Sequence, residues 1–209
     1  MAELTITTFL SLDGVMQAPG GPGEDESGGF PHGGWVIPLF DEDLGKVMTG
    51  IFSKPDAFLL GRTTYDIFAG YWPKINDPSD LIAAKLNSLP KFVASRTRST
   101  FAWSNTTLVR DVEKDVIELK QRLAGELQVH GSAGLAQTLI GKDLIDEYRL
   151  ITFPVVLGTG KRLFGSGAVP RNLRLVSSST TSSGVIVSYY RSAGSLKTGT
   201  AGPDLSRQP

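Results

Sequence analysis

The sequence predicts an α/β domain with a mostly parallel sheet, helices on both faces and an antiparallel edge. Short apolar runs typical of buried strands alternate with stretches whose apolar residues recur every three or four positions, which is the helical pattern. The chain then closes on two strand-like stretches joined by a short turn, which predicts a hairpin. Because parallel sheets are buried on both sides, helices are expected on both faces.

The first half of the chain contains both strand-like and helix-like patterns of apolar residues. Residues 4–10 are apolar or β-branched and predict a strand, while residues 41–52 predict a helix with Leu44, Met48 and Ile51 on its buried face. The run 57–60, which ends at Gly61, reads as a strand buried on both faces. The other elements expected here are helices at 63–71 and 79–89 and a strand at 91–95.

The second half continues the alternation and ends in the hairpin. Residues 111–124 predict a helix with Val112, Val116 and Leu119 on one side. The other elements expected here are strands at 106–109 and 127–130, a helix at 135–140, a strand within 145–156, and hairpin strands at 173–180 and 184–191.

Composition excludes several classes of protein. The 209 residues include 21 Lys+Arg and 21 Asp+Glu, so the formal net charge of zero argues against a protein that coats nucleic acid. There is no cysteine, which excludes disulfides, thiolate metal sites and a cysteine nucleophile. The two histidines are too few and too separate to predict a metal site. No transmembrane stretch or signal peptide is recognised, so we expect a cytoplasmic protein.

Two segments are too rich in small or polar residues to form regular elements. Residues 17–34 hold seven glycines and three prolines and predict a long loop, which is either a lid over a pocket or a tolerated surface insertion. Residues 192–209 predict a flexible tail, because they have little to bury. The expected organisation is one domain at 1–191 followed by that tail.

Three junctions between a strand and a helix have phosphate-binding character. In open α/β sheets, ligands bind at the carboxyl ends of the strands, where a helix N-terminus offers free N–H groups. The junctions are Leu60 to Thr64, Ser95 to Arg98, and Gly131 to Leu135. Arg62, Arg96 and Arg98 would concentrate positive charge there, and guanidinium groups fit phosphate oxygens well. A glycine after a strand by itself indicates only a turn, but the three junctions together predict a binding site for a phosphorylated nucleotide.

Four collinear motifs resemble the dihydrofolate reductase superfamily, and more closely the reductase domain of bacterial riboflavin biosynthesis, the RibD C-terminal domain. The motifs are Ser11-Leu12-Asp13-Gly14, Leu59-Leu60-Gly61-Arg62-Thr63-Thr64-Tyr65-Asp66, His130-Gly131-Ser132-Ala133-Gly134-Leu135, and the stretch from Pro154 to Phe164. The resemblance runs from about Glu3 to Arg191. It implies a three-layer α/β/α fold with an eight-stranded, mostly parallel sheet, and homodimers are common in such families.

The resemblance implies NADPH as the hydride donor. By position in the motifs, Gly61, Arg62, Thr63 and Thr64 match the first cofactor loop. Ser95 and Arg96 match the segment that holds the adenosine ribose and its 2′-phosphate, and the phosphate argument from the residues adds Thr97 beside them. Gly131, Ser132, Ala133, Gly134 and Leu135 match the loop at the nicotinamide and pyrophosphate. This agrees with the phosphate argument made from the residues alone.

Two acids are candidates for the catalytic carboxylate. Asp13 matches an aspartate that faces the substrate in the riboflavin branch, although an Asx-turn with Gly14 explains it equally well. Asp43 lies closest to the pterin-binding acid of dihydrofolate reductases, although acids in a first helical turn often serve the helix dipole. His130 most simply fills a core or pocket wall.

The substrate is left open among three functions. The first is an NADPH-dependent reductase resembling 5-amino-6-(5-phosphoribosylamino)uracil reductase, in which hydride transfer needs orientation and a proton source. The zinc deaminase that usually accompanies that reductase needs cysteine ligands, which this chain lacks. The second is a dihydrofolate or other pteridine reductase that uses Asp43, and the third is an NADPH-binding protein without turnover. The expected partner is a small-molecule substrate, with no nucleic acid, membrane or metal.

Overall fold

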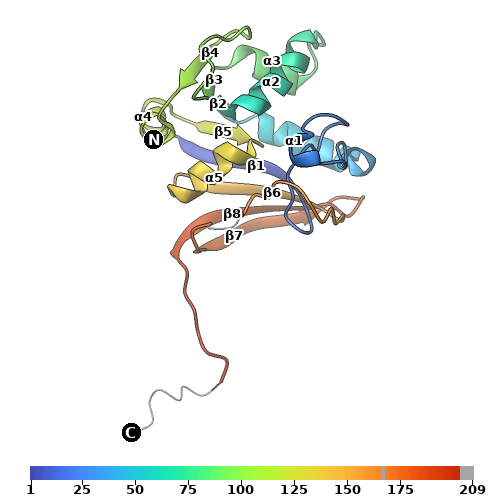
Figure 1. Cartoon of the computed structure of the whole chain (residues 1–209), viewed down its shortest axis with the longest axis vertical. Helices are drawn as coiled ribbons and strands as arrows, with labels where there is room; N and C mark the ends of the chain where they lie inside the picture. Colours follow the sequence, from blue (N-terminus) through green and yellow to red (C-terminus); the bar gives the residue numbers. More distant parts are fainter. Residues whose placement is uncertain (166–167, 203–209) are drawn as a thin grey trace.

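One sheet organises the protein, which we describe from a computed structural model covering residues 1–165 and 168–202. Within those residues, eight strands lie in the order β4-β3-β2-β5-β1-β6-β8-β7 (Figure 1). Their bounds are β1 (Glu3–Ser11), β2 (Pro55–Gly61), β3 (Lys91–Ala94), β4 (Thr106–Val109), β5 (Glu126–His130), β6 (Glu147–Phe153), β7 (Arg171–Thr180) and β8 (Ile186–Ser195). Strands β1 to β6 pair in parallel, and β8 is antiparallel to both β6 and β7. The predicted fold class is confirmed.

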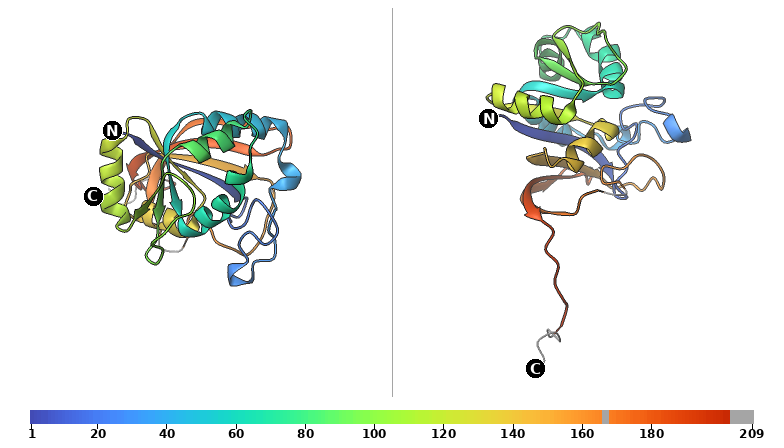
Figure 2. Two further views of the ribbon diagram at one scale, coloured as in Figure 1. Left: turned by 90° about the horizontal axis from the view of Figure 1, so that it is seen from above. Right: turned by 60° about the vertical axis from the view of Figure 1, so that its left-hand side comes forward.

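Helices cover both faces of this sheet (Figure 2). Their bounds are α1 (Glu42–Phe52), α2 (Arg62–Tyr71), α3 (Leu81–Ser88), α4 (Val112–Arg122) and α5 (Ala133–Gly141), with short 3-10 turns η1 (Ser27–Gly29), η2 (Ile37–Leu39) and η3 (Trp72–Lys74). One hydrophobic cluster joins the sheet to α4 and α5, and a second joins the opposite face to α1 and α3. Tyr65 of α2 packs into the second cluster.

Local chemistry moves some element ends from where the residue pattern places them. Helix α3 begins at Leu81 rather than at 79. Asp80 is its N-cap residue, because the Asp80 side chain accepts a hydrogen bond from the Ala83 N–H at 2.9 Å. Helix α5 begins at Ala133, two residues earlier than the apolar pattern indicates. Strand β8 continues to Ser195 because it pairs with the start of β7, where Arg171 lies opposite Ser195.

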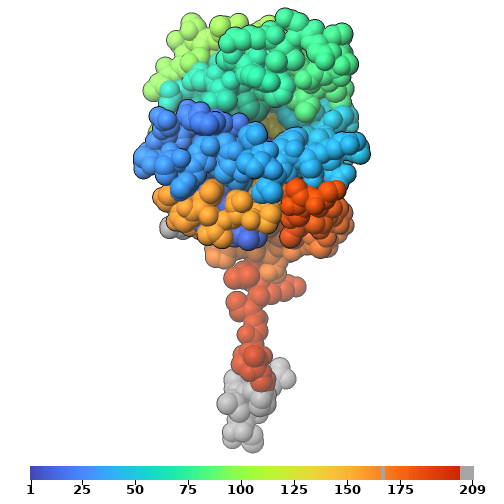
Figure 3. Space-filling view, turned by 90° about the vertical axis from the view of Figure 1, so that its right-hand side faces the viewer, coloured from blue at the N-terminus to red at the C-terminus, as the bar shows by residue number. Residues whose placement is uncertain are grey.

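The glycine-rich loop is held by the side chain of Gln17. That amide is buried, and its nitrogen donates to the backbone oxygens of Asp25 and Ser27, both at 2.9 Å. The Trp35 indole donates to the Gln17 backbone oxygen at 2.8 Å. Residues 17–34 therefore form a defined band, in blue in Figure 3, across one face of the molecule.

The end of the chain leaves the body of the protein. Beyond β8, residues 196–202 contain no helix or strand and lead away from the sheet (Figure 1). The remainder of the predicted tail, 203–209, lies outside the described residues. None of the described helices has the length and hydrophobicity needed to cross a membrane.

Candidate functional site

A cavity of about 1620 Å³ opens at the carboxyl ends of β4, β3, β2, β5 and β1. The ends of parallel strands meet at one edge of the sheet, which is where ligands bind in open α/β folds. All twelve residues predicted to bind the cofactor line this cavity: Gly61, Arg62, Thr63, Thr64, Ser95, Arg96, Thr97, Gly131, Ser132, Ala133, Gly134 and Leu135. Three loops that are separate in the sequence are therefore one surface in the fold.

Two helices point uncapped N-termini at the cavity. Helices α1, α3 and α4 each begin with an aspartate whose side chain accepts a backbone N–H, namely Asp41, Asp80 and Asp111. Helices α2 and α5 are preceded by Gly61 and Ser132 at the N-cap position and have no such bond. Their first-turn N–H groups need another acceptor, and an anion satisfies them while complementing the helix dipole.

The start of α5 adopts a backbone conformation suited to an anion. Gly131 and Ser132 have φ of +59° and +64°, which is left-handed, and Ala133 then enters the right-handed helix. A left-handed residue beside a right-handed one turns consecutive N–H groups to the same side, which forms an anion-binding concavity. Because only glycine adopts this conformation without cost, Gly131 is suited to its position.

The uncapped ends of α2 and α5 are tied to each other. The Ser132 hydroxyl accepts a hydrogen bond from the Gly61 N–H at 2.8 Å and donates one to the Thr64 hydroxyl at 2.7 Å. A β-carbon on Gly61 would lie 2.9 Å from both the β-carbon and the hydroxyl of Ser132. Gly61 is therefore required by close approach, and the two loops keep one relative position.

The end of β3 adds positive charge. Ser95 is buried, and its hydroxyl accepts the Arg98 N–H at 3.0 Å, which shapes a turn that leaves Arg96 and Thr97 exposed. Among the described residues, no carboxylate forms an ion pair with Arg62 or Arg96. Both guanidinium groups are therefore available to an anionic ligand.

Arg98 does not contribute as predicted. Its guanidinium pairs with Asp66 at 2.6 Å and it is absent from the cavity wall. A further arginine of the wall is Arg110, which follows β4 and donates to the backbone oxygens of Ser95 and Arg98 at 2.8 and 2.9 Å. The sequence holds one signal for Arg110, its place directly after a strand, but not the strand order that brings it to the cavity.

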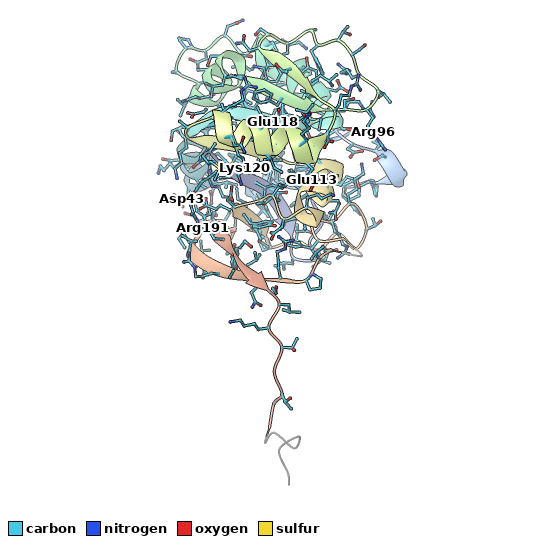
Figure 4. All side chains as sticks on the ribbon, turned by 90° about the vertical axis from the view of Figure 1, so that its left-hand side faces the viewer. Asp43, Arg96, Glu113, Glu118, Lys120 and Arg191 are labelled. Atoms are coloured by element: carbon cyan, nitrogen blue, oxygen red, sulfur yellow. The ribbon has the colours of Figure 1, made fainter. Side chains whose placement is uncertain are left out.

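The two predicted acids lie outside the cavity wall. Asp13 accepts hydrogen bonds from the Ser11 hydroxyl at 2.6 Å and from the N–H groups of Leu157 and Gly158 at 3.1 and 2.9 Å. These bonds, that of Ser11 above all, lower the pKa of Asp13 to about 2. Asp43 accepts from the Ser182 N–H at 3.2 Å, and Figure 4 shows it on the opposite side of the view from Arg96.

The glycine-rich loop forms part of the wall and brings acids of its own. Glu24 and Asp25 line the cavity together with Lys161, whose ammonium group pairs with Asp25 at 2.6 Å. Burial raises the pKa of Glu24, whose carboxylate accepts the Gly21 N–H at 3.1 Å. Sequence reasoning missed these acids because nothing in a glycine-rich stretch indicates which side chains turn inward.

The part of the cavity between α1 and the sheet, which α2, η3 and α3 also border, is lined mainly by apolar side chains. Its lining side chains share aromatic or long aliphatic character and are Phe9, Phe40, Met48, Phe52, Phe68, Trp72 and Ile82. His130 lies on its floor, stacked on Phe52 with ring centroids 4.3 Å apart. Such a compartment accommodates a flat ring. Among the described residues, no group of three His, Asp or Glu could hold a metal ion.

The family model for the RibD C-terminal domain matches residues 2–187. The chain belongs to this family. The protein YyaP of Bacillus subtilis, itself uncharacterised, is 31% identical over 190 residues, which are 90% of this chain and 94% of that protein. This RibD C-terminal family member thus has a close relative of nearly the same length.

Solved structures of related fold agree with the assignment. A putative riboflavin biosynthesis protein from Shewanella sp. PV-4 matches with a TM-score of 0.69 at 22% identity, over 92% of this chain and 99% of the other. Dihydrofolate reductase from Enterococcus faecalis, complexed with NADP(H) and RAB-propyl, matches with a TM-score of 0.58 at 12% identity, over 91% and 96%. This RibD C-terminal domain therefore has the dihydrofolate reductase-like fold.

Proposed function

We propose that this protein is an NADPH-dependent reductase of the RibD C-terminal family. The observation that carries the proposal is the pair of uncapped helix N-termini, α2 and α5, which open on one cavity beside the unpaired guanidinium groups of Arg62 and Arg96. The family and the NADP(H) carried by the dihydrofolate reductase of similar fold support this reading.

The residues of the cavity fit that cofactor group by group. The N–H groups of Gly131 to Leu135 would hold the pyrophosphate, and Arg62, Ser95, Arg96 and Thr97 would hold the ribose and its 2′-phosphate. NADPH supplies a hydride when bound, and the protein supplies orientation and exclusion of water. The rigid link between Gly61 and Ser132 fixes the spacing between the two phosphate-binding loops.

The proposed substrate resembles 5-amino-6-(5-phosphoribosylamino)uracil, whose ribosyl group would become ribityl. The flat ring of this substrate would lie in the apolar compartment between α1 and the sheet. Of the two proton sources considered, Asp13 and water, the geometry favours water. Asp13 is ionised near neutral pH, and its oxygens are occupied by four donors, the fourth being the Arg162 guanidinium at 3.3 Å. We propose that Asp13 positions the segment after β6.

Removal of the two arginines tests the cofactor assignment. We expect Arg62→Ala and Arg96→Ala each to weaken NADPH binding by roughly tenfold or more, because each removes a charged hydrogen bond to phosphate. NADH has no 2′-phosphate, so Arg96→Ala should change its affinity little. Titration of nicotinamide fluorescence measures both, with Arg122→Ala on α4, which is exposed and absent from the cavity wall, as the matched control.

Two outcomes would contradict the proposal. Equal losses for NADPH and NADH in Arg96→Ala would refute the 2′-phosphate site, and absence of NADPH binding to the unmodified protein would refute the cofactor. Tight NADPH binding with no oxidation across a panel of pyrimidine and pteridine substrates would instead favour a binding protein without turnover.

A further inference from the structure

His130 stands at the junction of the cavity and the buried sheet. It is the last residue of β5, its side chain is 6% exposed, and it lines the cavity. Its ring stacks on Phe52 of α1 with an interplanar angle of 17°. The stacking fixes the plane of the ring. What remains to be decided is which of its two nitrogens carries the hydrogen.

Gln128 assigns the proton of that ring. Its amide nitrogen lies 2.8 Å from the backbone oxygen of Ile51 and 2.7 Å from a carboxylate oxygen of Glu126. Both partners can only accept, so this end of the side chain must be the NH₂ group. The amide oxygen of Gln128 then faces Nε2 of His130 at 3.0 Å, and Nε2 must carry the hydrogen.

The carboxylate that orients Gln128 is itself held in place. Arg149 donates to both oxygens of Glu126, at 3.0 and 2.8 Å, and to Glu147 at 2.8 Å. Arg149 is 2% exposed, and Arg191 of β8 extends the set by pairing with Glu147 at 3.2 Å. This row of charged side chains keeps Glu126 ionised and acceptor-only, so the direction of the hydrogen bonds to His130 is fixed.

The imidazole is neutral in this environment. Burial, followed by the positive charge of Arg149, lowers the pKa of His130 to about 3, while Glu126 acts weakly in the opposite sense. A neutral ring with hydrogen on Nε2 carries a lone pair on Nδ1. Among the described residues, no hydrogen bond reaches Nδ1.

A second polar group on the same floor lacks a partner. Thr7 of β1 is paired in register with His130, lines the cavity, and has a buried hydroxyl without a hydrogen bond among the described residues. Phe9 and Phe52, which line the same cavity, carry no hydrogen-bonding group in their side chains. Polar groups that are buried without partners mark places where a ligand or water completes the bonding.

We propose that His130 determines substrate specificity, by accepting at Nδ1 a hydrogen bond from an uncharged planar heterocycle that carries an N–H donor. The ring would lie among Phe9, Met48 and Phe52, whose side chains carry no charge to select a cationic ring. The proposal rests on the proposed function only in assigning this compartment to the substrate. A substrate N–H that is methylated, or replaced by an acceptor, leaves Nδ1 unpaired and binds more weakly.

The tautomer can be observed directly in the unmodified protein. The protein has only two histidines, so the spectrum of protein labelled with ¹⁵N-histidine contains two rings, and that of exposed His32 serves as the reference. We expect the His130 ring to keep its hydrogen on Nε2 and not to titrate between about pH 5 and 9. A ring protonated at Nδ1, or one that becomes charged in this range, would overturn the proposal.

A matched pair of ligands tests the acceptor. Lumazine has ring N–H donors, and 1,3-dimethyllumazine has the same bicyclic shape without them. With NADP⁺ present, we expect lumazine to bind roughly tenfold more tightly, to shift the Nδ1 resonance, and to lose this preference in His130→Leu. Gln128→Met, which retains His130 but releases its tautomer, should reduce the preference.

The ligand comparison and the spectra each test the role of His130. Equal binding of the two ligands by the unmodified protein, or binding of neither, would overturn the role of His130, and the spectra of the unmodified protein decide it even if a variant fails to fold. Failure of the reductase proposal looks different. In that case NADPH fails to bind. The two ligands are then compared without NADP⁺, and the preference for lumazine and its effect on the Nδ1 resonance persist.

Discussion

At the residue scale, Asp13 shows how local hydrogen bonding decides what a carboxylate can do. The side chain joins the end of β1 to the segment that follows β6, because it accepts from Ser11 on one side and from Leu157 and Gly158 on the other. An acid used in this way holds two chain segments together. The sequence offered an Asx-turn as the structural alternative, but the N–H of Val15 donates to the Ser11 hydroxyl instead, and the partners at 157 and 158 have no signal in the sequence.

The acid dependence of stability tests this role. The pKa of Asp13 is lowered in the fold from 3.8 to about 2, so its contribution is present above about pH 4 and is lost as the pH falls toward 2. We expect Asp13→Asn to lower the melting temperature at pH 6, and the difference from the unmodified protein to shrink between pH 4 and 2. Thermal unfolding followed by circular dichroism measures this. A difference that stays constant with pH would refute the role.

Single residues also mark the limit of sequence reasoning at the site. Arg62 directly follows β2 and Arg96 lies two residues beyond the end of β3, and these positions along the chain sufficed to place both in the cavity. Arg98 and Arg110 have equally plausible positions along the chain. The ion pair with Asp66 holds Arg98 away from the cavity wall, and the turn after β4 brings Arg110 into it. Pairing between distant side chains is decided in three dimensions, so a local pattern does not report it.

At the element scale, the contact between the starts of α2 and α5 determines how the two phosphate-binding loops are arranged. We expect Gly61→Ala to destabilise the fold by about 1–3 kcal/mol, because its β-carbon would overlap Ser132. NADPH affinity should fall as well, since the loops must separate. Chemical denaturation and fluorescence titration measure the two effects.

The control for this substitution lies on α1. Gly50 is exposed, and nothing lies within 4 Å of the β-carbon that alanine would add. Gly50→Ala should leave NADPH binding unchanged and stabilise the protein by up to about 1 kcal/mol through helix propensity. If both substitutions have the same effect on stability, close approach at Gly61 is not the cause.

Most elements were predictable because their local signals are strong. Apolar periodicity located every strand and every α-helix, and the prolonged apolar run before Gly61 marked β2 as buried on both faces. The ends of elements were less accessible. Strand β8 runs to Ser195 through Ser, Ala and Gly because β7 supplies its hydrogen-bond partners, and small residues carry no pattern that reveals such pairing.

At the scale of the whole molecule, the order of the strands in the sheet could not be predicted from the pattern of residues alone. The order β4-β3-β2-β5-β1-β6-β8-β7 places β1 between β5 and β6, far from its neighbours in the sequence. The resemblance to a known family supplied the fold, and with it the meeting of three distant loops. The apolar compartment and its histidine floor were visible only after the sheet was assembled.

A homodimer stays a prediction, and the structure suggests where to test it. Every residue of β7 from Arg174 to Thr180 is exposed, including Leu175 and Val176, and an uncovered edge strand with apolar side chains favours association. We expect a dimer by light scattering and a monomer for the double variant Leu175→Lys, Val176→Lys. Ile117→Lys on α4, a residue of similar exposure, should leave the dimer intact. A monomeric unmodified protein would refute the expectation.

The row of charged side chains beneath His130 has a consequence for how the sheet assembles. Side chains alternate between the two faces of a strand, so a slip of β6 by one residue would turn Arg149 and Glu147 into the apolar cluster under α4 and α5. Tyr148 and Leu150 would take their places beside Glu126 and Arg191, and the buried charges would lose their partners. Misregistered sheets are thereby penalised during folding, so the residues that orient the imidazole also select the native alignment of β5, β6 and β8.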